Sequence, residues 1–152
     1  MTVRRVLRTV GVAIIASSTL VVGGLAASSS AATGPKLKVT PSTNLKNGST
    51  VKVSGSGFKA KDQIYLVECL ATSKGESNCS LNTLIGPFVI NSKGVLATTK
   101  FKVATGKIGT GKGAGTCGTT KANLKKCAVS AGTTTGTDSA VFVVTFALPK
   151  KK

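Results

Sequence analysis

Four cysteines at matched spacing are the feature that most restricts how this chain can fold. Nine residues separate Cys69 from Cys79, and nine separate Cys117 from Cys127. Four cysteines permit three pairings. We favour the two short bridges, because each would close a loop with turn residues at its tip and stabilise the fold by about 3 kcal/mol. An alternative bridge, Cys69 to Cys127, has an antibody-like separation, but the chain has no Trp to pack on it.

The amino-terminal segment indicates that these cysteines are oxidised. Three arginines precede an apolar run over residues 10–25, and small residues follow it. This order is typical of a signal peptide. We expect residues 1–32 to be removed by cleavage near Ala31 or Ala32 and the protein to be secreted, where disulfides persist. The alternative, an uncleaved membrane anchor, is disfavoured because the run is shorter than the ~20 residues of a membrane span.

The length and charge of the remaining residues indicate how many domains they form and which partners they attract. We expect one domain over residues 33–149, a basic tail over residues 150–152, and a monomer. Three of the 21 basic residues are arginines of the leader, so 18 lysines face 4 acidic residues and the mature net charge is +14. Such a charge attracts polyanions, including DNA weakly. A solvated surface that keeps the protein soluble is the alternative, and we favour it somewhat.

Short alternating segments separated by turn residues predict an all-β protein. Seven such segments are what an immunoglobulin-like seven-stranded β-sandwich needs. The expected strands are residues 36–40, 50–56, 63–69, 87–90, 95–103, 126–130 and 139–146.

Two glycine-containing turns and two of the strands allow more detailed predictions about pairing and exposure. Asn47-Gly48 and Ser92-Lys93-Gly94 predict hairpins between the first two strands and between the fourth and fifth. Alternation in residues 95–103 places Leu96 and the lysines of that strand in water. Residues 139–146 are apolar on both faces, which predicts a strand that is covered on both sides or lines a cleft.

The segment over residues 104–125 is rich in glycine and poor in apolar residues. It predicts a long, mobile surface loop or a loose hairpin, and such loops are either functional or disordered. Residues 106–112 match the first seven positions of a phosphate-binding loop. Gly113 follows in place of Ser or Thr, and no helix is expected there, so we interpret the match as a coincidence of composition.

Several kinds of chemistry are disfavoured by counts alone. The chain has no His to serve as the base of a nucleophilic triad, and only four carboxylates for paired acid–base work. No His and no closely spaced cysteine pair are present to bind a metal. We therefore expect a binding protein that is not an enzyme, with no catalytic residues, no bound metal and no required cofactor.

Several short motifs follow one another along the chain. They are Val39-Thr40-Pro41-Ser42, residues 51–58 with a Gly-x-Gly bend, the spacing from Cys69 to Cys79, Asn91-Ser92-Lys93-Gly94 and Gly115-Thr116-Cys117. In this order they resemble the neocarzinostatin family, the enediyne antibiotic apoproteins. The first motif resembles the family's first strand, and residues 51–58 resemble its second strand with the bend that ends it. The resemblance extends over residues 38–146.

The resemblance implies a sandwich with a cleft between one sheet and two disulfide-closed ribbons. In the family, a hydrophobic chromophore is held there without a covalent bond, and antibiotic, antimicrobial and DNA-damaging activity acts through it. Family positions that are aromatic fall here on residues that do not stack, at Ala71, Leu84 and Lys107. The expected ligand-binding residues, beside the four cysteines, are Ala71, Leu84, Lys107, Ala128 and Gly132.

An alternative function needs no chromophore. The same sandwich could be a rigid frame for a basic module that adheres to the cell envelope or to another polyanion through its lysines. This alternative predicts binding that weakens strongly with salt.

Overall fold

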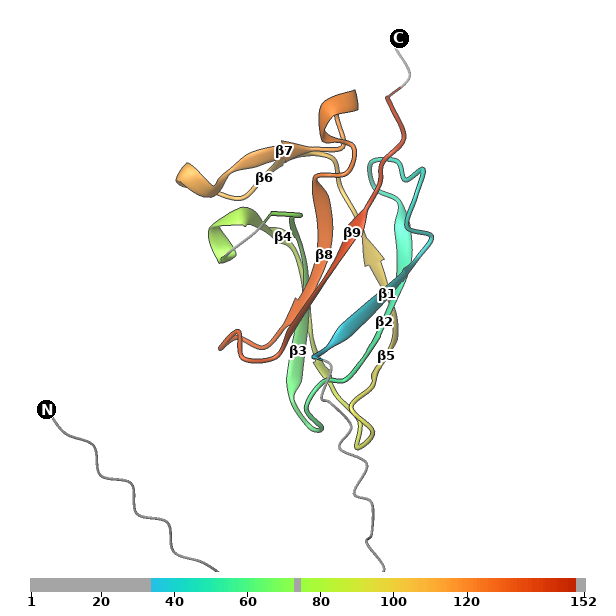
Figure 1. Cartoon of the computed structure of the whole chain (residues 1–152), viewed down its shortest axis with the longest axis vertical. Helices are drawn as coiled ribbons and strands as arrows, with labels where there is room; N and C mark the ends of the chain where they lie inside the picture. Colours follow the sequence, from blue (N-terminus) through green and yellow to red (C-terminus); the bar gives the residue numbers. More distant parts are fainter. Residues whose placement is uncertain (1–33, 73–74, 150–152) are drawn as a thin grey trace, which may run out of the picture.

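Two antiparallel sheets packed face to face form the sandwich, with a small ribbon at one end (Figure 1). The structure is a computed structural model that describes residues 34–72 and 75–149. The expected leader over residues 1–32 and tail over residues 150–152 lie outside the described residues. One sheet has the order β1-β2-β5 and the other the order β4-β3-β8-β9.

The strands are divided between the two sheets and the ribbon, and three short 3-10 turns connect them. The three-stranded sheet contains β1 (Lys36–Thr40), β2 (Thr50–Ser56) and β5 (Leu96–Lys102). The four-stranded sheet contains β3 (Gln63–Leu70), β4 (Cys79–Val89), β8 (Cys127–Gly132) and β9 (Ser139–Val144). The ribbon pairs β6 (Gly106–Ile108) with β7 (Gly115–Cys117), and the 3-10 turns are η1 (Glu76–Asn78), η2 (Gly111–Gly113) and η3 (Lys121–Asn123).

The seven predicted strands are confirmed, and the fourth is longer than expected. It begins at Cys79 rather than near Pro87, and Gly86-Pro87 lies inside it. Because β4 is the edge of its sheet, a proline that cannot donate a hydrogen bond is tolerated there. Its register against β3 also shifts twice, so its pairing is irregular.

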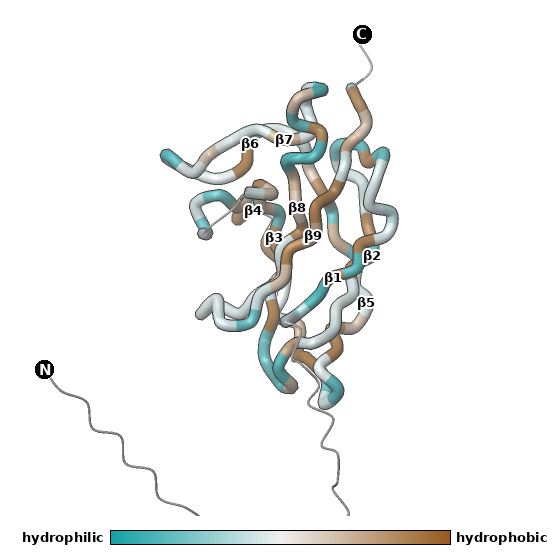
Figure 2. The backbone as a smooth tube through the Cα atoms, viewed as in Figure 1, coloured by the Kyte–Doolittle hydropathy of each residue, from teal (hydrophilic) through white to brown (hydrophobic). Residues whose placement is uncertain are grey.

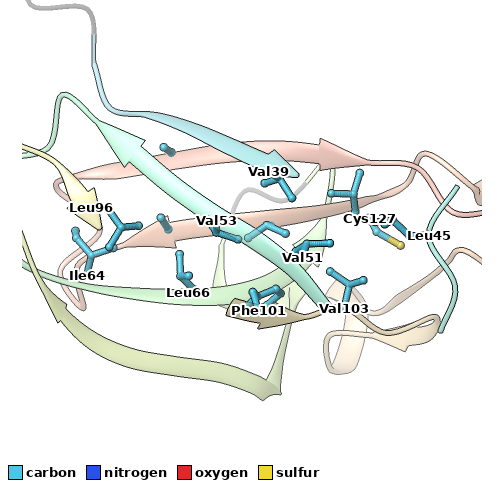
Figure 3. Close-up of a cluster of buried hydrophobic side chains, with 14 of the residues drawn as sticks. Val39, Leu45, Val51, Val53, Ile64, Leu66, Leu96, Phe101, Val103 and Cys127 are labelled. Carbon is cyan, nitrogen blue, oxygen red and sulfur yellow. The ribbon is translucent and has the colours of Figure 1, made fainter. Parts of the chain in front are cut away.

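The core lies between the sheets and is filled by the inward side chains of each strand. Val51, Val53 and Phe101 of the three-stranded sheet are buried with Ile64 and Leu66 of the facing sheet (Figure 3). Burial of such apolar surface stabilises the fold by roughly 25 cal/mol per Å². This packing fixes which residues of every strand point outward.

One of the two predicted hairpins is wrong. β1 pairs with β2 around a turn in which Gly48 has φ 77°, so the first hairpin is confirmed. At the second site, the Gly94 N–H donates to the Asn91 carbonyl (3.0 Å), which closes the expected turn. β4 nevertheless pairs with β3 and β5 with β2. The turn therefore carries the chain from one sheet to the other.

A bulge in β5 corrects the predicted face of Leu96. Val53 is opposite Thr99 and Gly55 is opposite Leu96, so one more residue lies on β5 than on β2 between these pairs. The extra residue reverses the alternation. Leu96 is consequently 1% exposed and belongs to the core, whereas Lys100 and Lys102 are exposed as expected.

Of the two alternatives for residues 104–125, the hairpin is confirmed. β6 and β7 pair in antiparallel register, and the side chains of Ile108 and Cys117 are buried. Residues 111–113 form a short 3-10 turn where a phosphate-binding loop would have a helix. The Asn123 carboxamide accepts the N–H groups of Thr119 and Thr120 at 2.9 and 2.8 Å, which closes the following turn.

The structure has the cysteine pairing favoured by loop length. Cys69 is bonded to Cys79 across the start of β4, and Cys117 joins the ribbon to Cys127 at the start of β8. Both residues of the second bridge are fully buried, whereas Cys79 is half-buried. The two bridges close loops of equal length, so their loop-entropy contributions match.

Replacing both Cys117 and Cys127 by Ala should lower the free energy of unfolding by more than the ~3 kcal/mol of loop entropy, because it also leaves a cavity in the core. Replacing Cys69 and Cys79 by Ala is the matched control and should cost less. Urea denaturation of the two variants and the wild type measures the difference. Equal losses would contradict the importance of burial at the second bridge.

Candidate ligand-binding cleft

The outer face of the four-stranded sheet contains a cleft of about 660 Å³. Its floor is the sheet itself, its first wall is the loop closed by the Cys69–Cys79 bridge, and its second wall is the turn between β8 and β9. Its lining includes Tyr65, Val67, Glu76, Leu81, Leu84, Ser130, Gly132, Thr133, Thr134, Ser139 and Val141. The volume lies within the range typical of small-molecule sites.

Strand alternation explains why the floor is apolar. Ile64 and Leu66 of β3 point into the core, so Tyr65 and Val67, which alternate with them, point into the cleft. On β9, Val144 is buried while Val141 is 55% exposed and lines the cleft. Figure 2 shows the hydrophobic colour of this strand. The alternative in which residues 139–146 line a cleft thus holds for Ser139 and Val141, whereas the outward-facing Val143 lies outside the cleft.

The lining defines what chemistry the cleft can accept. Apolar side chains on β3, β4 and β9 line the cleft together with one aromatic residue, Tyr65. The polar groups are mainly hydroxyls of Ser130, Thr133, Thr134 and Ser139, with one carboxylate at Glu76. Such a lining suits a largely apolar molecule with a few hydrogen-bonding groups.

The turn between β8 and β9 is held by its own hydrogen bonds. The Thr133 N–H donates to the Asp138 carbonyl (3.2 Å), and the Gly136 N–H donates to the Thr133 carbonyl (3.0 Å). The hydroxyls of Thr133, Thr135 and Thr137 lie 3.0–3.3 Å from one another. Of these three residues Thr133 lines the cleft, so contacts within the turn hold the one hydroxyl of the set that belongs to the wall.

The five expected ligand-binding residues do not all lie at this cleft. Leu84 and Gly132 line it, as do Cys69 and Cys79. Ala128 is fully buried within β8, Lys107 is exposed on β6, and Ala71 follows β3, where its N–H donates to the Lys126 carbonyl (2.8 Å).

Sequence reasoning missed most of the floor. Tyr65, Val67 and Val141 were not among the expected ligand-binding residues. The signal was present for β3, because residues 64–67 are apolar on both faces, as residues 139–146 are. A strand whose two faces are both apolar indicates either burial on both sides or a cleft.

The β6–β7 ribbon contacts the disulfide-closed wall of the cleft but does not line the cleft itself. The Thr110 N–H donates to the Ser77 carbonyl (2.8 Å), and the Asn78 carboxamide donates to the Gly113 carbonyl (2.7 Å). A side chain at Gly109 would collide with the Ser77 carbonyl. Among the described residues, then, the cleft has one disulfide-closed wall rather than the two that the resemblance implied, and β6–β7 holds that wall from outside (Figure 1).

Glu68 is an ionisable group buried on the other face of β3. Its Oε2 atom accepts the Ala104 N–H (2.8 Å), where the chain leaves β5 for the ribbon, and its Oε1 atom has no hydrogen-bond partner in the described part of the chain. Burial raises the pKa of Glu68 from its ordinary 4.5 to about 7, against the opposing effect of that hydrogen bond.

The carboxylate of Glu68 lies near the second disulfide. One of its oxygens and the sulfurs of Cys117 and Cys127 lie within 4.8 Å of one another. Because the two sulfurs are bonded to each other, they are not thiolate ligands here. We therefore assign Glu68 to positioning the ribbon rather than to binding a metal.

The fold and cleft define an immunoglobulin-like β-sandwich with a binding-sized cleft on one sheet. A family model for the neocarzinostatin family matches residues 37–146. The chain belongs to the neocarzinostatin family. In the part of the chain that the structure describes, no helix is long and apolar enough to span a membrane.

Solved structures agree with this assignment. The chain is similar to macromomycin, with a TM-score of 0.56 and 28% identity over 75% of this chain and 100% of that one. It is also similar to apokedarcidin in its solution conformation, with a TM-score of 0.50 and 28% identity over 75% and 99% of the two chains. No curated protein sequence matches it.

The raised pKa of Glu68 predicts how stability depends on pH. Between about pH 4.5 and 7 the unfolded carboxyl loses its proton while the folded one keeps it, so stability should fall as pH rises through this window and level off above it. Glu68→Gln should remove this fall. Urea midpoints at pH 4.5, 6 and 8 measure it, with the exposed Glu76→Gln as the control for a lost charge. If the stability of Glu68→Gln fell with pH as that of the wild type does, the fall could not be attributed to the raised pKa of Glu68.

Proposed function

We propose that this protein is a secreted, non-enzymatic carrier that holds a hydrophobic small molecule in the cleft without a covalent bond. The observation that carries the proposal is the cleft itself, an apolar floor of Tyr65, Val67 and Val141 between two walls fixed by hydrogen bonds or a disulfide. Membership in the neocarzinostatin family supports it.

Binding would be driven by removal of apolar surface from water. Each Å² of apolar surface buried is worth about 25 cal/mol before the costs of association. Hydroxyls of Ser130, Thr133 and Ser139 in the lining would orient the ligand. Walls held before the ligand arrives reduce the entropy lost on binding.

The nature of the cargo follows from the family resemblance. It implies an enediyne chromophore, with antibiotic and DNA-damaging activity exerted by the released ligand, so that the protein contacts DNA indirectly. Two disulfides fit an oxidising compartment. We extend the proposal to export by residues 1–32, a mature domain over residues 33–149 and a monomeric carrier.

The cleft can be tested with two valines on one strand. Val141 lines it and is 55% exposed, whereas Val143 is 47% exposed and does not line it. N-phenyl-1-naphthylamine is a suitable fluorescent probe because it is neutral and so insensitive to the basic surface. Val141→Glu should weaken its binding at least tenfold, since a carboxylate would be desolvated by the ligand. Val143→Glu should change it less than threefold.

A second pair on β4 gives an independent check. Leu84 lines the cleft and Val89 does not, although both are exposed. Leu84→Glu should reproduce the loss and Val89→Glu should not. The proposal fails if the probe does not saturate on the wild type, or if the two variants of each pair lose binding equally.

A further inference from the structure

The outer face of the three-stranded sheet carries a row of lysines. We call it the lysine track; it consists of Lys36 and Lys38 on β1, Lys52 on β2, and Lys100 and Lys102 on β5, all exposed. Val39, Val51 and Phe101, which alternate with them, are buried in the core. Packing of the core therefore forces these lysines onto one face.

Strand register shows that the track is a line rather than a scattered patch. Lys52 is opposite Lys100 on β5 and opposite Thr40 on β1, and Lys38 is opposite Ser54. The row thus begins at the β5 pair, crosses β2 at Lys52 and ends at the β1 pair. With about 6.8 Å between alternate residues of a strand and about 4.8 Å between strands, it is roughly 20 Å long.

No acidic residue lies on the three strands of this sheet to neutralise the track. The four acidic residues of the chain are Asp62, Glu68, Glu76 and Asp138, none of which falls in β1, β2 or β5. Lys52 and Lys100 are directly opposite each other, an arrangement of like charges that destabilises a sheet. A bound chain of negative charges would relieve this repulsion.

The residues beside the lysines indicate which class of polyanion the track can bind. Hydroxyls of Thr40, Thr50 and Ser56 are exposed beside the track. The three strands have no Arg to read a base edge, and their one aromatic residue, Phe101, is buried, which leaves none to stack on a base. The face therefore suits phosphates joined by hydroxylated linkers better than it suits nucleotides.

We propose that the lysine track binds one extended chain of a polyol phosphate polymer, with phosphates on the lysines and linker hydroxyls on the serine and threonine side chains. The track lies on the opposite side of the sandwich from the cleft. Polymer binding is thus independent of the proposed carrier function, and each can fail without the other.

The test compares two variants with the same net charge. The track variant replaces Lys36, Lys38, Lys52, Lys100 and Lys102 by Gln. The control variant replaces five other exposed lysines by Gln, Lys107, Lys112, Lys121, Lys125 and Lys126. Fluorescence anisotropy with labelled poly(glycerol phosphate) at 50 and 200 mM NaCl reports affinity and its salt dependence.

Wild-type affinity should fall with salt with a log–log slope of about −0.7 per phosphate contacted, and so about −3.5 for the five lysines of the track. The track variant should lose at least tenfold in affinity and most of this slope, while the control variant loses less than threefold. Lys100→Gln with Lys102→Gln, a milder change, should reduce the slope by about 1.4.

Two outcomes would overturn the proposal. Equal losses in the track and control variants would show that only total charge matters. Tighter binding of a 20-nucleotide oligothymidylate than of poly(glycerol phosphate) would show that the partner is a single-stranded nucleic acid. Urea denaturation of the track variant verifies its fold, and its binding of N-phenyl-1-naphthylamine reports the cleft separately. If the five-residue variant does not fold, the two-residue variant decides the matter.

Discussion

Packing of the two sheets against each other is the constraint on which both faces of this protein depend. Val51 and Phe101 must point inward to meet Ile64 and Leu66, and the two-residue period of a strand then leaves no choice for their neighbours. On β3 the neighbours are apolar and make the floor of a cleft. On β2 and β5 they are lysines and make a basic face. One core thus creates two outer surfaces of opposite chemistry.

Regions outside the two sheets depend on other interactions. The ribbon over residues 106–117 buries Ile108, but its glycines contribute no side chains to the core. The Cys117–Cys127 bridge and the hydrogen bond from Ala104 to Glu68 fix its base, while contacts with Ser77 and Asn78 fix its tip. The Glu68 carboxyl group therefore fixes the base of the ribbon at a cost in desolvation that its one hydrogen bond offsets only in part.

Much of this fold could be predicted from local pattern. Alternation and turn residues were sufficient for seven strands, and loop length was sufficient for the cysteine pairing. The predictions failed where pairing between segments distant in the sequence determines the structure. The turn at Asn91–Gly94 looks like a hairpin locally, but its strands prefer different partners. The bulge that turns Leu96 inward depends on register against β2 and leaves no trace in β5 alone.

The same limit explains the candidate site. Leu84 and Gly132 were expected beside the cleft from the family resemblance and lie there, on β4 and at the end of β8, although the predicted strands over residues 87–90 and 126–130 did not include them. Lys107 was expected among the ligand-binding residues. The ribbon that carries it is instead hydrogen-bonded to η1, and this contact joins segments about thirty residues apart in the chain. Residue placement on strands is local information, whereas placement of a ribbon against a loop is not.

The two surfaces are separated well enough to act independently. Packed sheets lie about 10 Å apart, and the Debye length is about 8 Å at physiological ionic strength. Charges that face solvent on one sheet are therefore more than a Debye length from the outer face of the other, and salt in the surrounding solvent largely screens their interaction. A neutral ligand in the cleft would feel little of the +14 charge expected for the mature domain. Hydrophobic binding on one side and salt-dependent binding on the other can thus coexist in a domain of this size.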